Sequence, residues 1–182
     1  RAVPNLTIAS PMDEHELRNL MYTAQLPNKG TFVIRYPRGN GVHAEWRTPM
    51  KEVAVGTGRC LREGTELAII SFGPIGNEVV NVLDEMPTTK SVAHYDLRFV
   101  KPLDENMLQE IGNRFKKIIT IEDGVRNGGM GSAVLEWLND HKFYPQMVRM
   151  GLPDAFVEHG SVAQLRQLVG LDADSIRKEI EA

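Results

Sequence analysis

Two arginines in the run Arg35-Tyr36-Pro37-Arg38-Gly39 have the chemistry of a binding site for a phosphate or a carboxylate. The apolar residues 32–34 before this run are typical of a strand that is buried on both faces. Pro37 ends strand pairing because it has no N–H to donate, and Gly39 lets the backbone turn away. The arginines would then lie at the carboxyl end of a parallel strand, where open α/β sheets bind ligands and a planar guanidinium suits an oxyanion. On spacing alone, two surface arginines in salt bridges are the alternative.

The glycine-rich run from Gly128 to Ser132 could also hold an anion. It lies between an expected strand and an expected helix, where free backbone N–H groups and the helix dipole attract negative charge. The run lacks the spacing of a dinucleotide fingerprint and the lysine of a P-loop. We therefore interpret these glycines as allowing the helix start to pack closely against a neighbour, and we predict no nucleotide site there.

Two other polar groups can be interpreted either as sites or as structure. Four charged residues follow one expected strand and could bind a polar ligand, although pairing of the first two with each other or with the loops is favoured: Asp96, Arg98, Lys101 and Asp104. Glu158-His159 suggests a general base, because histidine titrates near neutral pH. No nucleophile lies at a recognisable spacing, so a surface or hinge role is predicted for this pair.

A parallel sheet is needed to position these residues, and the first part of the chain predicts one βαβ unit. Leu6–Ala9 and Thr31–Arg35 have strand patterns, and a helix is expected to begin after Ser10-Pro11. Its apolar residues repeat at helical spacing, at Leu17, Leu20, Met21 and Ala24. Such a unit is too small to bury its own faces, so we expect further sheet upstream.

After a linker at residues 40–51, the chain predicts a second, larger α/β unit. Glu52–Arg62 and Leu67–Phe72 are expected to form an antiparallel edge hairpin that leads into a buried strand. Strands and helices then alternate, which indicates a mostly parallel sheet with helices on both faces. The further strands are expected at Ser91–Tyr95, Ile118–Ile121 and Gln146–Met150. The helices are expected at about Gly76–Glu85, after Asp104, from the run Gly128–Ser132 through Leu138, and at Val162–Val169 and Ser175–Ile180.

The composition argues against several classes of protein. The chain has 182 residues and a formal charge of −3, and no run of basic residues indicates nucleic-acid binding. No apolar run approaches the ~20 residues that span a bilayer, and no segment has the pattern of a signal peptide. The single cysteine, Cys60, fits a reducing cytosol, and the five histidines lie at no metal-ligand spacing. We expect a cytoplasmic protein that binds no membrane, and its start within a strand-like segment suggests a fragment.

Four motifs occur in the same order as in the 1-deoxy-D-xylulose-5-phosphate synthase family, which the chain resembles over essentially its whole length. They are Arg35–Gly39, Asp96–Asp104, Gly128–Val134 and Gly151–Gly160, and Gly170–Asp174 matches as well. The resemblance implies that residues 1–44 are the C-terminal end of a pyrimidine-binding domain. It implies that residues 45–182 are a transketolase-like C-terminal domain, a three-layer sandwich around a mixed five-stranded sheet with four parallel strands and one antiparallel strand.

The resemblance also implies an activity for the parent protein. The family condenses pyruvate with D-glyceraldehyde 3-phosphate, with loss of CO₂, to give a precursor of isoprenoids, thiamine and pyridoxal. Thiamine diphosphate and Mg²⁺ serve as cofactors, and a homodimer is expected. Arg38 matches the family residue that holds the phosphate of glyceraldehyde 3-phosphate. For Arg35 and Tyr36 a structural role is favoured, with substrate binding as the alternative.

The family motifs that bind the cofactor are absent from this chain. It has no Gly-Asp-Gly…Asn motif for Mg²⁺ and diphosphate, and it lacks the glutamate and histidines that serve thiamine diphosphate. We therefore expect the chain alone to be inactive, without catalytic residues, cofactor or metal. The alternatives are a stand-alone module that binds a phosphorylated metabolite or organises subunits, and the β-chain of a 2-oxoacid dehydrogenase.

Overall fold

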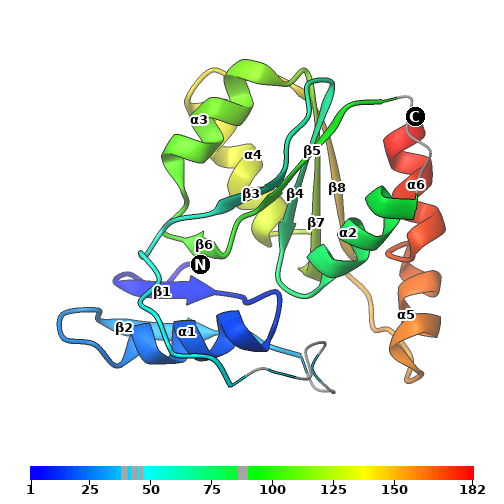
Figure 1. Cartoon of the computed structure of the whole chain (residues 1–182). Coiled ribbons are helices and arrows are strands. Elements are labelled where there is room, and N and C mark those ends of the chain that lie inside the picture. Colours follow the sequence, from blue (N-terminus) through cyan, green and yellow to red (C-terminus); the bar gives the residue numbers. More distant parts are fainter. Residues whose placement is uncertain (38–40, 42–44, 46, 86–89) are drawn as a thin grey trace.

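The computed structural model describes residues 1–37, 41, 45, 47–85 and 90–182, and these form a small sheet and a large sheet with their helices (Figure 1). Both sheets contain strands from the second half of the chain, so the two parts of the structure are joined through strand pairing. In chain order the elements are β1 (Leu6–Ala9), α1 (Glu14–Ala24), β2 (Thr31–Ile34), β3 (Arg59–Arg62), β4 (Leu67–Phe72), α2 (Ile75–Glu85), β5 (Val92–Asp96), β6 (Phe99–Lys101), α3 (Glu105–Arg114), β7 (Lys117–Val125), α4 (Met130–Asp140), β8 (Gln146–Leu152), α5 (Val162–Val169) and α6 (Ala173–Glu181).

The small sheet contains the predicted βαβ unit and a strand that was not predicted. β1 and β2 run parallel, and α1 connects them after a cap in which the Asp13 side chain accepts from the backbone N–H of Glu16 at 2.8 Å. β6 pairs antiparallel with the other edge of β1, so the sheet order is β2-β1-β6. Of the apolar residues at helical spacing in α1, Leu20 is fully buried, whereas Met21 is 51% exposed.

The large sheet confirms the predicted mixed, five-stranded architecture. Its order is β3-β5-β4-β7-β8, with the last four strands parallel and β3 antiparallel to β5. The predicted hairpin between the segments 52–62 and 67–72 is wrong, because both edges of β4 are already paired with the parallel strands β5 and β7. β4 is buried at every position, so it occupies the centre of the sheet and β3 is left at the edge.

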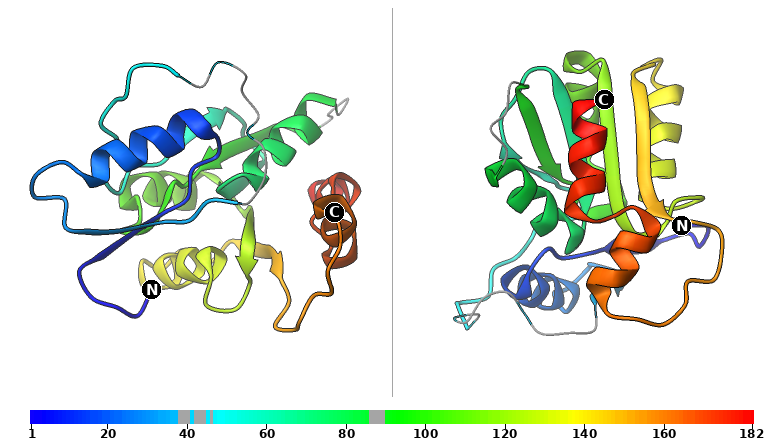
Figure 2. Two further views of the ribbon diagram at one scale, coloured as in Figure 1. Left: turned by 90° about the horizontal axis from the view of Figure 1, so that it is seen from below. Right: turned by 90° about the vertical axis from the view of Figure 1, so that its right-hand side faces the viewer.

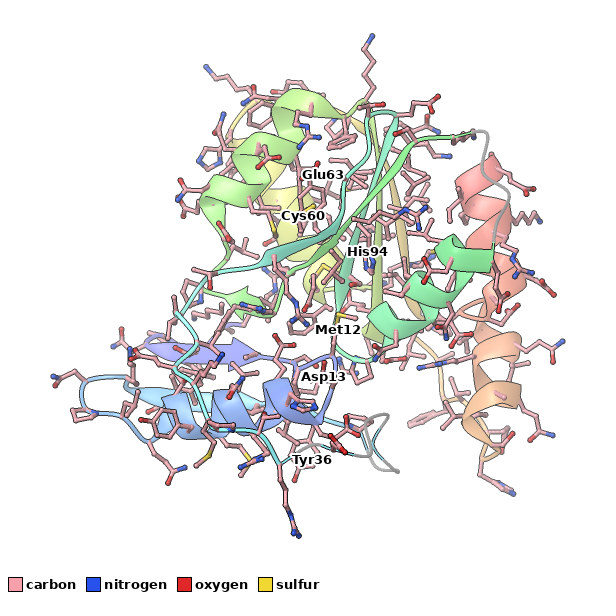
Figure 3. The ribbon with its side chains drawn as sticks, in the orientation of Figure 1. Met12, Asp13, Tyr36, Cys60, Glu63 and His94 are labelled. Carbon is pink, nitrogen blue, oxygen red and sulfur yellow. The ribbon has the colours of Figure 1, made fainter. Side chains whose placement is uncertain are left out.

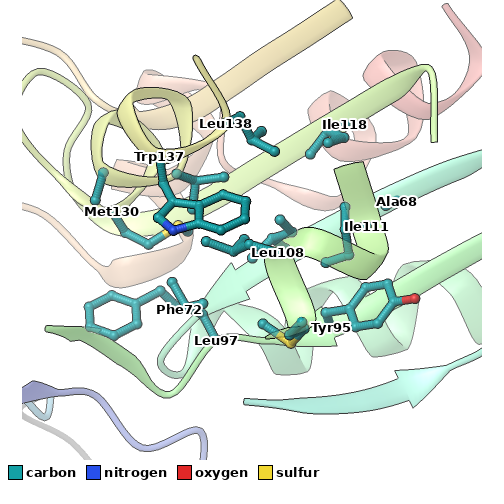
Figure 4. Packing of buried hydrophobic residues seen from close by; sticks show 14 of the residues in the cluster. Ala68, Phe72, Tyr95, Leu97, Leu108, Ile111, Ile118, Met130, Trp137 and Leu138 are labelled. Atoms are coloured by element: carbon teal, nitrogen blue, oxygen red, sulfur yellow. The ribbon is translucent and has the colours of Figure 1, made fainter. Parts of the chain in front are cut away.

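Helices cover both faces of the large sheet and form the expected three layers (Figures 1 and 2). On one face, α3 and α4 pack against β4, β5 and β7 through a large apolar cluster that includes Trp137, Leu108 and Phe72 (Figure 4). On the other face, α2 and α6 form a second cluster with Ile69 and Ile119. α5 has no buried residue and lies at the outside of this layer.

Candidate functional site

Of the three predicted ligand-binding residues, Arg35 and Tyr36 are described, and Arg38 lies outside the described residues. The backbone of Arg35 extends β2, since its N–H donates to the carbonyl of Ala9 at 2.9 Å and its carbonyl accepts from Ser10 Oγ at 2.8 Å. Its guanidinium donates to the backbone carbonyl of Asp123, which belongs to β7. Arg35 therefore connects the end of β2 to the large sheet, which is a structural role.

Tyr36 and Pro37 line a cavity of about 450 Å³ between the βαβ unit and α2. One wall comes from the start of α1 and includes Met12 and Asp13, which Figure 3 shows facing the large unit, above the exposed ring of Tyr36. The opposite wall comes from the start of α2. The described lining residues are Pro11, Met12, Asp13, Glu14, Leu17, Tyr36, Pro37, Gly41, Pro74, Asn77, Glu78, Asn81 and Arg166.

The described lining of this cavity carries charges of both signs. Three carboxylates, those of Asp13, Glu14 and Glu78, face one guanidinium, that of Arg166. Arg166 Nη1 lies 3.1 Å from Glu78 Oε2, so part of its charge is already compensated. Arg38, whose guanidinium could bind a phosphate, follows the lining residue Pro37 directly in the sequence.

The glycine-rich start of α4 is not open to an anion, because a carboxylate of the chain occupies it. Glu122 is 3% exposed, and its two oxygens accept from the backbone N–H groups of Met130 and Gly131, each at 2.9 Å. A Cβ at Gly129 would lie 2.5 Å from both of these oxygens, so glycine is required for this close approach. The interpretation that the glycines serve packing is therefore correct, and a diphosphate could bind these amides only by displacing Glu122.

The four charged residues at 96–104 do not form one ligand site. Asp96 pairs with Arg59, and Arg98 pairs with Glu16 of α1. Arg98 and Asp96 also contact each other, as predicted, through the Arg98 backbone N–H and Asp96 Oδ1 at 3.2 Å. The other two residues have separate partners. Lys101 Nζ donates to the carbonyl of Arg1 at 3.0 Å, and Asp104 caps α3 by accepting from the N–H of Met107 at 2.9 Å.

Glu158 and His159 lie in an exposed segment between β8 and α5, which is consistent with the predicted surface role. In the part of the chain that the structure describes, no three His, Cys, Asp or Glu residues gather to hold a metal ion. The described residues thus offer no ligand cluster for Mg²⁺, and Glu122 already occupies the amides at the start of α4, so we derive no chemical step through thiamine diphosphate within this chain. No helix among the described residues is both long and apolar enough to cross a bilayer.

The structure contains buried polar groups that sequence reasoning missed. Glu16 is 4% exposed although it lies in the first turn of a helix, where an acid is ordinarily a solvated partner of the helix dipole. His94 is 1% exposed and lies 2.8 Å, through Nε2, from Ser71 Oγ on the adjacent strand (Figure 3). Burial, and to a lesser extent Arg59, lowers the pKa of His94 to about 4, so this imidazole stays neutral at pH 7.

Comparison with known proteins identifies the class to which this fold belongs. Residues 56–176 match the family described as "Transketolase, C-terminal domain". This match covers most of the chain, and the chain therefore belongs to the transketolase C-terminal domain family. Its fold is also similar to that of a solved structure titled "Split gene transketolase, inactive beta4 tetramer", with a TM-score of 0.82 and 23% identity, over 100% of this chain and 58% of that one.

Curated relatives with the 1-deoxy-D-xylulose-5-phosphate synthase name confirm the resemblance that the motifs indicated. The chain is 58% identical over 182 residues to the synthase of Bacteroides thetaiotaomicron, covering 99% of this chain and 28% of the relative. It is 39% identical over 182 residues to that of Bacillus licheniformis, covering 99% of this chain and 29% of the relative. The chain thus spans less than a third of the length of these relatives.

Proposed function

We propose that this chain acts as the C-terminal part of a 1-deoxy-D-xylulose-5-phosphate synthase, which condenses pyruvate with D-glyceraldehyde 3-phosphate. The proposal rests on the 58% identity to the Bacteroides thetaiotaomicron synthase over 99% of this chain. Thiamine diphosphate would supply the carbanion chemistry in the complete protein, with Mg²⁺ binding its diphosphate. The residues for both cofactors would lie in the remaining part of that protein.

Within this proposal, Arg38 binds the phosphate of glyceraldehyde 3-phosphate. A guanidinium can donate two parallel hydrogen bonds to a phosphate, which gives both affinity and orientation. The cavity next to Tyr36 and Pro37 supports this role, because Arg38 follows the lining residue Pro37 directly in the sequence. Arg35 has its own structural partner on β7 and is left out of substrate binding.

The proposed division of the chain assigns residues 1–44 to the pyrimidine-binding domain and residues 45–182 to the C-terminal domain. The start of the family match at residue 56 supports this boundary. The complete protein is proposed to be a cytoplasmic homodimer, and its subunit number can be measured by light scattering after size-exclusion chromatography. Large apolar side chains exposed in the first 37 residues offer contact surface to other parts of a longer protein: Val3, Met21, Val33 and Tyr36.

The proposal is tested with the complete product of the gene that encodes this chain. The wild-type protein, supplied with thiamine diphosphate and Mg²⁺, should convert pyruvate and glyceraldehyde 3-phosphate to 1-deoxy-D-xylulose 5-phosphate. Arg38→Gln should raise the KM for glyceraldehyde 3-phosphate by about 10- to 100-fold, the loss expected for one charged hydrogen-bonded contact, and leave the KM for pyruvate nearly unchanged. Arg62→Gln is the matched control, because Arg62 is an exposed arginine that pairs with Asp84 at 3.2 Å on the edge of the sheet.

Absence of synthase activity in the complete protein would refute the proposal, and an unchanged KM in Arg38→Gln would refute the role of Arg38. The 182-residue chain by itself should show no activity and no heat of binding when titrated with thiamine diphosphate and Mg²⁺. Micromolar binding to the isolated chain would contradict our assignment of the cofactor site to the rest of the protein.

A further inference from the structure

Four charged residues form a buried ionic cluster where α1 meets the large unit. Arg98 Nε lies 2.6 Å from Glu16 Oε1, and Arg59 Nη2 lies 3.3 Å from Glu16 Oε2. The same Arg59 Nη2 lies 3.0 Å from Asp96 Oδ2, and Arg59 Nε donates to that oxygen at 3.1 Å. When Asp96 is ionised, two carboxylates share two guanidiniums, and the charges of the four side chains cancel.

This cluster is buried to a degree that makes it sensitive to the loss of any member. The side chains of Asp96 and Glu16 are 0% and 5% exposed, and those of Arg98 and Arg59 are 19% and 32% exposed. Removing one member of a buried ion pair leaves an uncompensated charge, which costs far more than the intact pair contributes. The cluster therefore favours one arrangement of its elements more strongly than an exposed pair would.

The members come from both units of the structure. Glu16 belongs to α1, which connects the two parallel strands of the small sheet, whereas Arg59 and Asp96 belong to β3 and β5 of the large sheet. Arg98 lies between β5 and β6 with a φ of 55°, a left-handed conformation that is uncommon outside glycine. Its backbone carbonyl also accepts from the N–H of Ser10 at 2.9 Å. Arg98 therefore joins the two units through both an ion pair and a backbone hydrogen bond.

Glu16 connects this cluster directly to the cavity beside Tyr36. Its Oε2 accepts from the backbone N–H of Met12 at 2.9 Å, and the carbonyl of Met12 accepts from Asn77 Nδ2 of α2 at 2.8 Å. Met12 and Asn77 line opposite walls of the cavity. The side chain of Met12 also packs against α2, because a Cβ added at Gly76 would lie 3.0 Å from its Sδ.

We propose that Glu16, Arg59, Asp96 and Arg98 form a positioning joint that sets the separation of the two cavity walls, and with it the placement of the phosphorylated substrate. The reference to this substrate rests on the function proposed above. None of the four residues lines the cavity, so each acts through Met12 and the start of α1. Misplacement of a bound group by 1 Å can cost about 10²-fold in rate, so a partial change at this joint should be measurable.

The test uses the complete gene product and compares three variants with the wild type. Glu16→Gln keeps an acceptor for the N–H of Met12 but leaves two guanidiniums against one carboxylate. Glu16→Gln combined with Arg98→Gln restores the balance of charge. Glu85→Gln is the matched control, because Glu85 pairs with Arg177 at 2.6 Å on the surface of the large unit, with 67% of its side chain exposed.

Two readouts are measured for each protein: the KM values for the two substrates, and amide hydrogen exchange of residues 10–20. Glu16→Gln should raise the KM for glyceraldehyde 3-phosphate about tenfold, change the KM for pyruvate less than about twofold, and speed exchange at residues 10–20. The double variant should recover most of both effects, since it removes the unpaired charge. Glu85→Gln should resemble the wild type.

Unchanged exchange in Glu16→Gln would refute the proposal that the cluster holds α1 in place. Faster exchange with an unchanged KM would refute the proposal that the cluster positions the substrate. If Glu16→Gln does not fold, the double variant still tests the joint. Exchange and KM values close to those of the wild type support it, and values that depart strongly from the wild type overturn it. A wild-type protein without synthase activity would refute the proposed function instead. Exchange at residues 10–20 would then still decide whether the cluster holds the two units together.

Discussion

The cap that Glu122 places on α4 gives a direct test of how this fold is stabilised. Glu122 is nearly fully buried, and its carboxylate accepts from the N–H groups of Met130 and Gly131 at the positive end of the helix dipole. Glu122→Gln keeps the shape of the side chain but leaves one acceptor oxygen, because the amide nitrogen cannot accept. One of the two buried N–H groups would therefore lose its partner.

The expected cost follows from three contributions. Loss of one hydrogen bond to a charged group costs about 1.5–3 kcal/mol, and loss of the charge at the helix dipole costs about 0.3–1 kcal/mol. Removing a buried charge recovers part of its desolvation penalty and offsets some of this loss. We expect Glu122→Gln to lower the free energy of unfolding by about 2 kcal/mol.

Urea unfolding of the 182-residue chain, followed by circular dichroism, measures this loss. Glu136→Gln is the matched control, because Glu136 lies on the same helix but pairs with Arg1 on the surface, where its side chain is 61% exposed. That change should cost less than about 1 kcal/mol. A loss below about 0.5 kcal/mol for Glu122→Gln, or an equal loss for both variants, would refute the role we assign to the cap.

Three further predictions concern other parts of the structure. Burial, together with the nearby Glu16 carboxylate, raises the pKa of Asp96 to about 7. Between about pH 4 and 7 the folded protein therefore keeps a proton on Asp96, whereas the unfolded chain, in which the pKa has its ordinary value near 4, has released it. The free energy of unfolding should therefore fall as pH rises from about 4 to 7. In urea titrations at several pH values, Asp96→Asn should reduce this pH dependence by the amount that up to about one bound proton contributes. The same pH dependence in the wild type and the variant would contradict the assignment. A Cβ at Gly64 would lie 2.2 Å from the backbone N of Ala93, so Gly64→Ala should lower the melting temperature and cost at least about 2 kcal/mol, whereas Gly160→Ala, which faces a flexible leucine side chain at 3.2 Å, should be nearly neutral. Ser161→Ala removes the capping box of α5, so exchange of the amides in that helix should accelerate while global stability changes by less than about 1 kcal/mol, because α5 buries no residue; a cooperative loss of the whole fold would refute this.

Local sequence patterns predicted most elements of the large sheet, because the start and end of each strand or helix are set by residues that are close together in the sequence. The bounds of β4 at Leu67–Phe72 were predicted from one continuous apolar run between turn signals, and the cap at Asp104 from its place before a helical repeat. The edge position and antiparallel direction of β3 were predicted correctly, but its partner was predicted wrongly, because strand partners depend on which edges are free in the assembled sheet. β6 was missed because its partner is β1, far away in the sequence.

The candidate site was predictable only in part, for a similar reason. The motif around Arg38 and the resemblance to a family indicated a phosphate-binding arginine. Nothing in the sequence around Glu16 or Glu122 distinguishes these two acids from solvated surface carboxylates, which are far more common. Their burial results from three-dimensional packing: Arg59 and Arg98 surround one carboxylate, and a helix start meets the other.

The pairing of β6 with β1 constrains the order in which this protein can be assembled. A ribosome releases residues 1–34 well before residue 99 exists, so the edge of β1 stays without its antiparallel partner during much of synthesis. An unpaired strand edge is prone to wrong associations, and closing so long a loop is slow. We therefore expect the small sheet to be completed last. For the same reason, proteolytic cleavage within residues 47–50 should leave two pieces that remain bound through β1 and β6 and migrate together on a native gel.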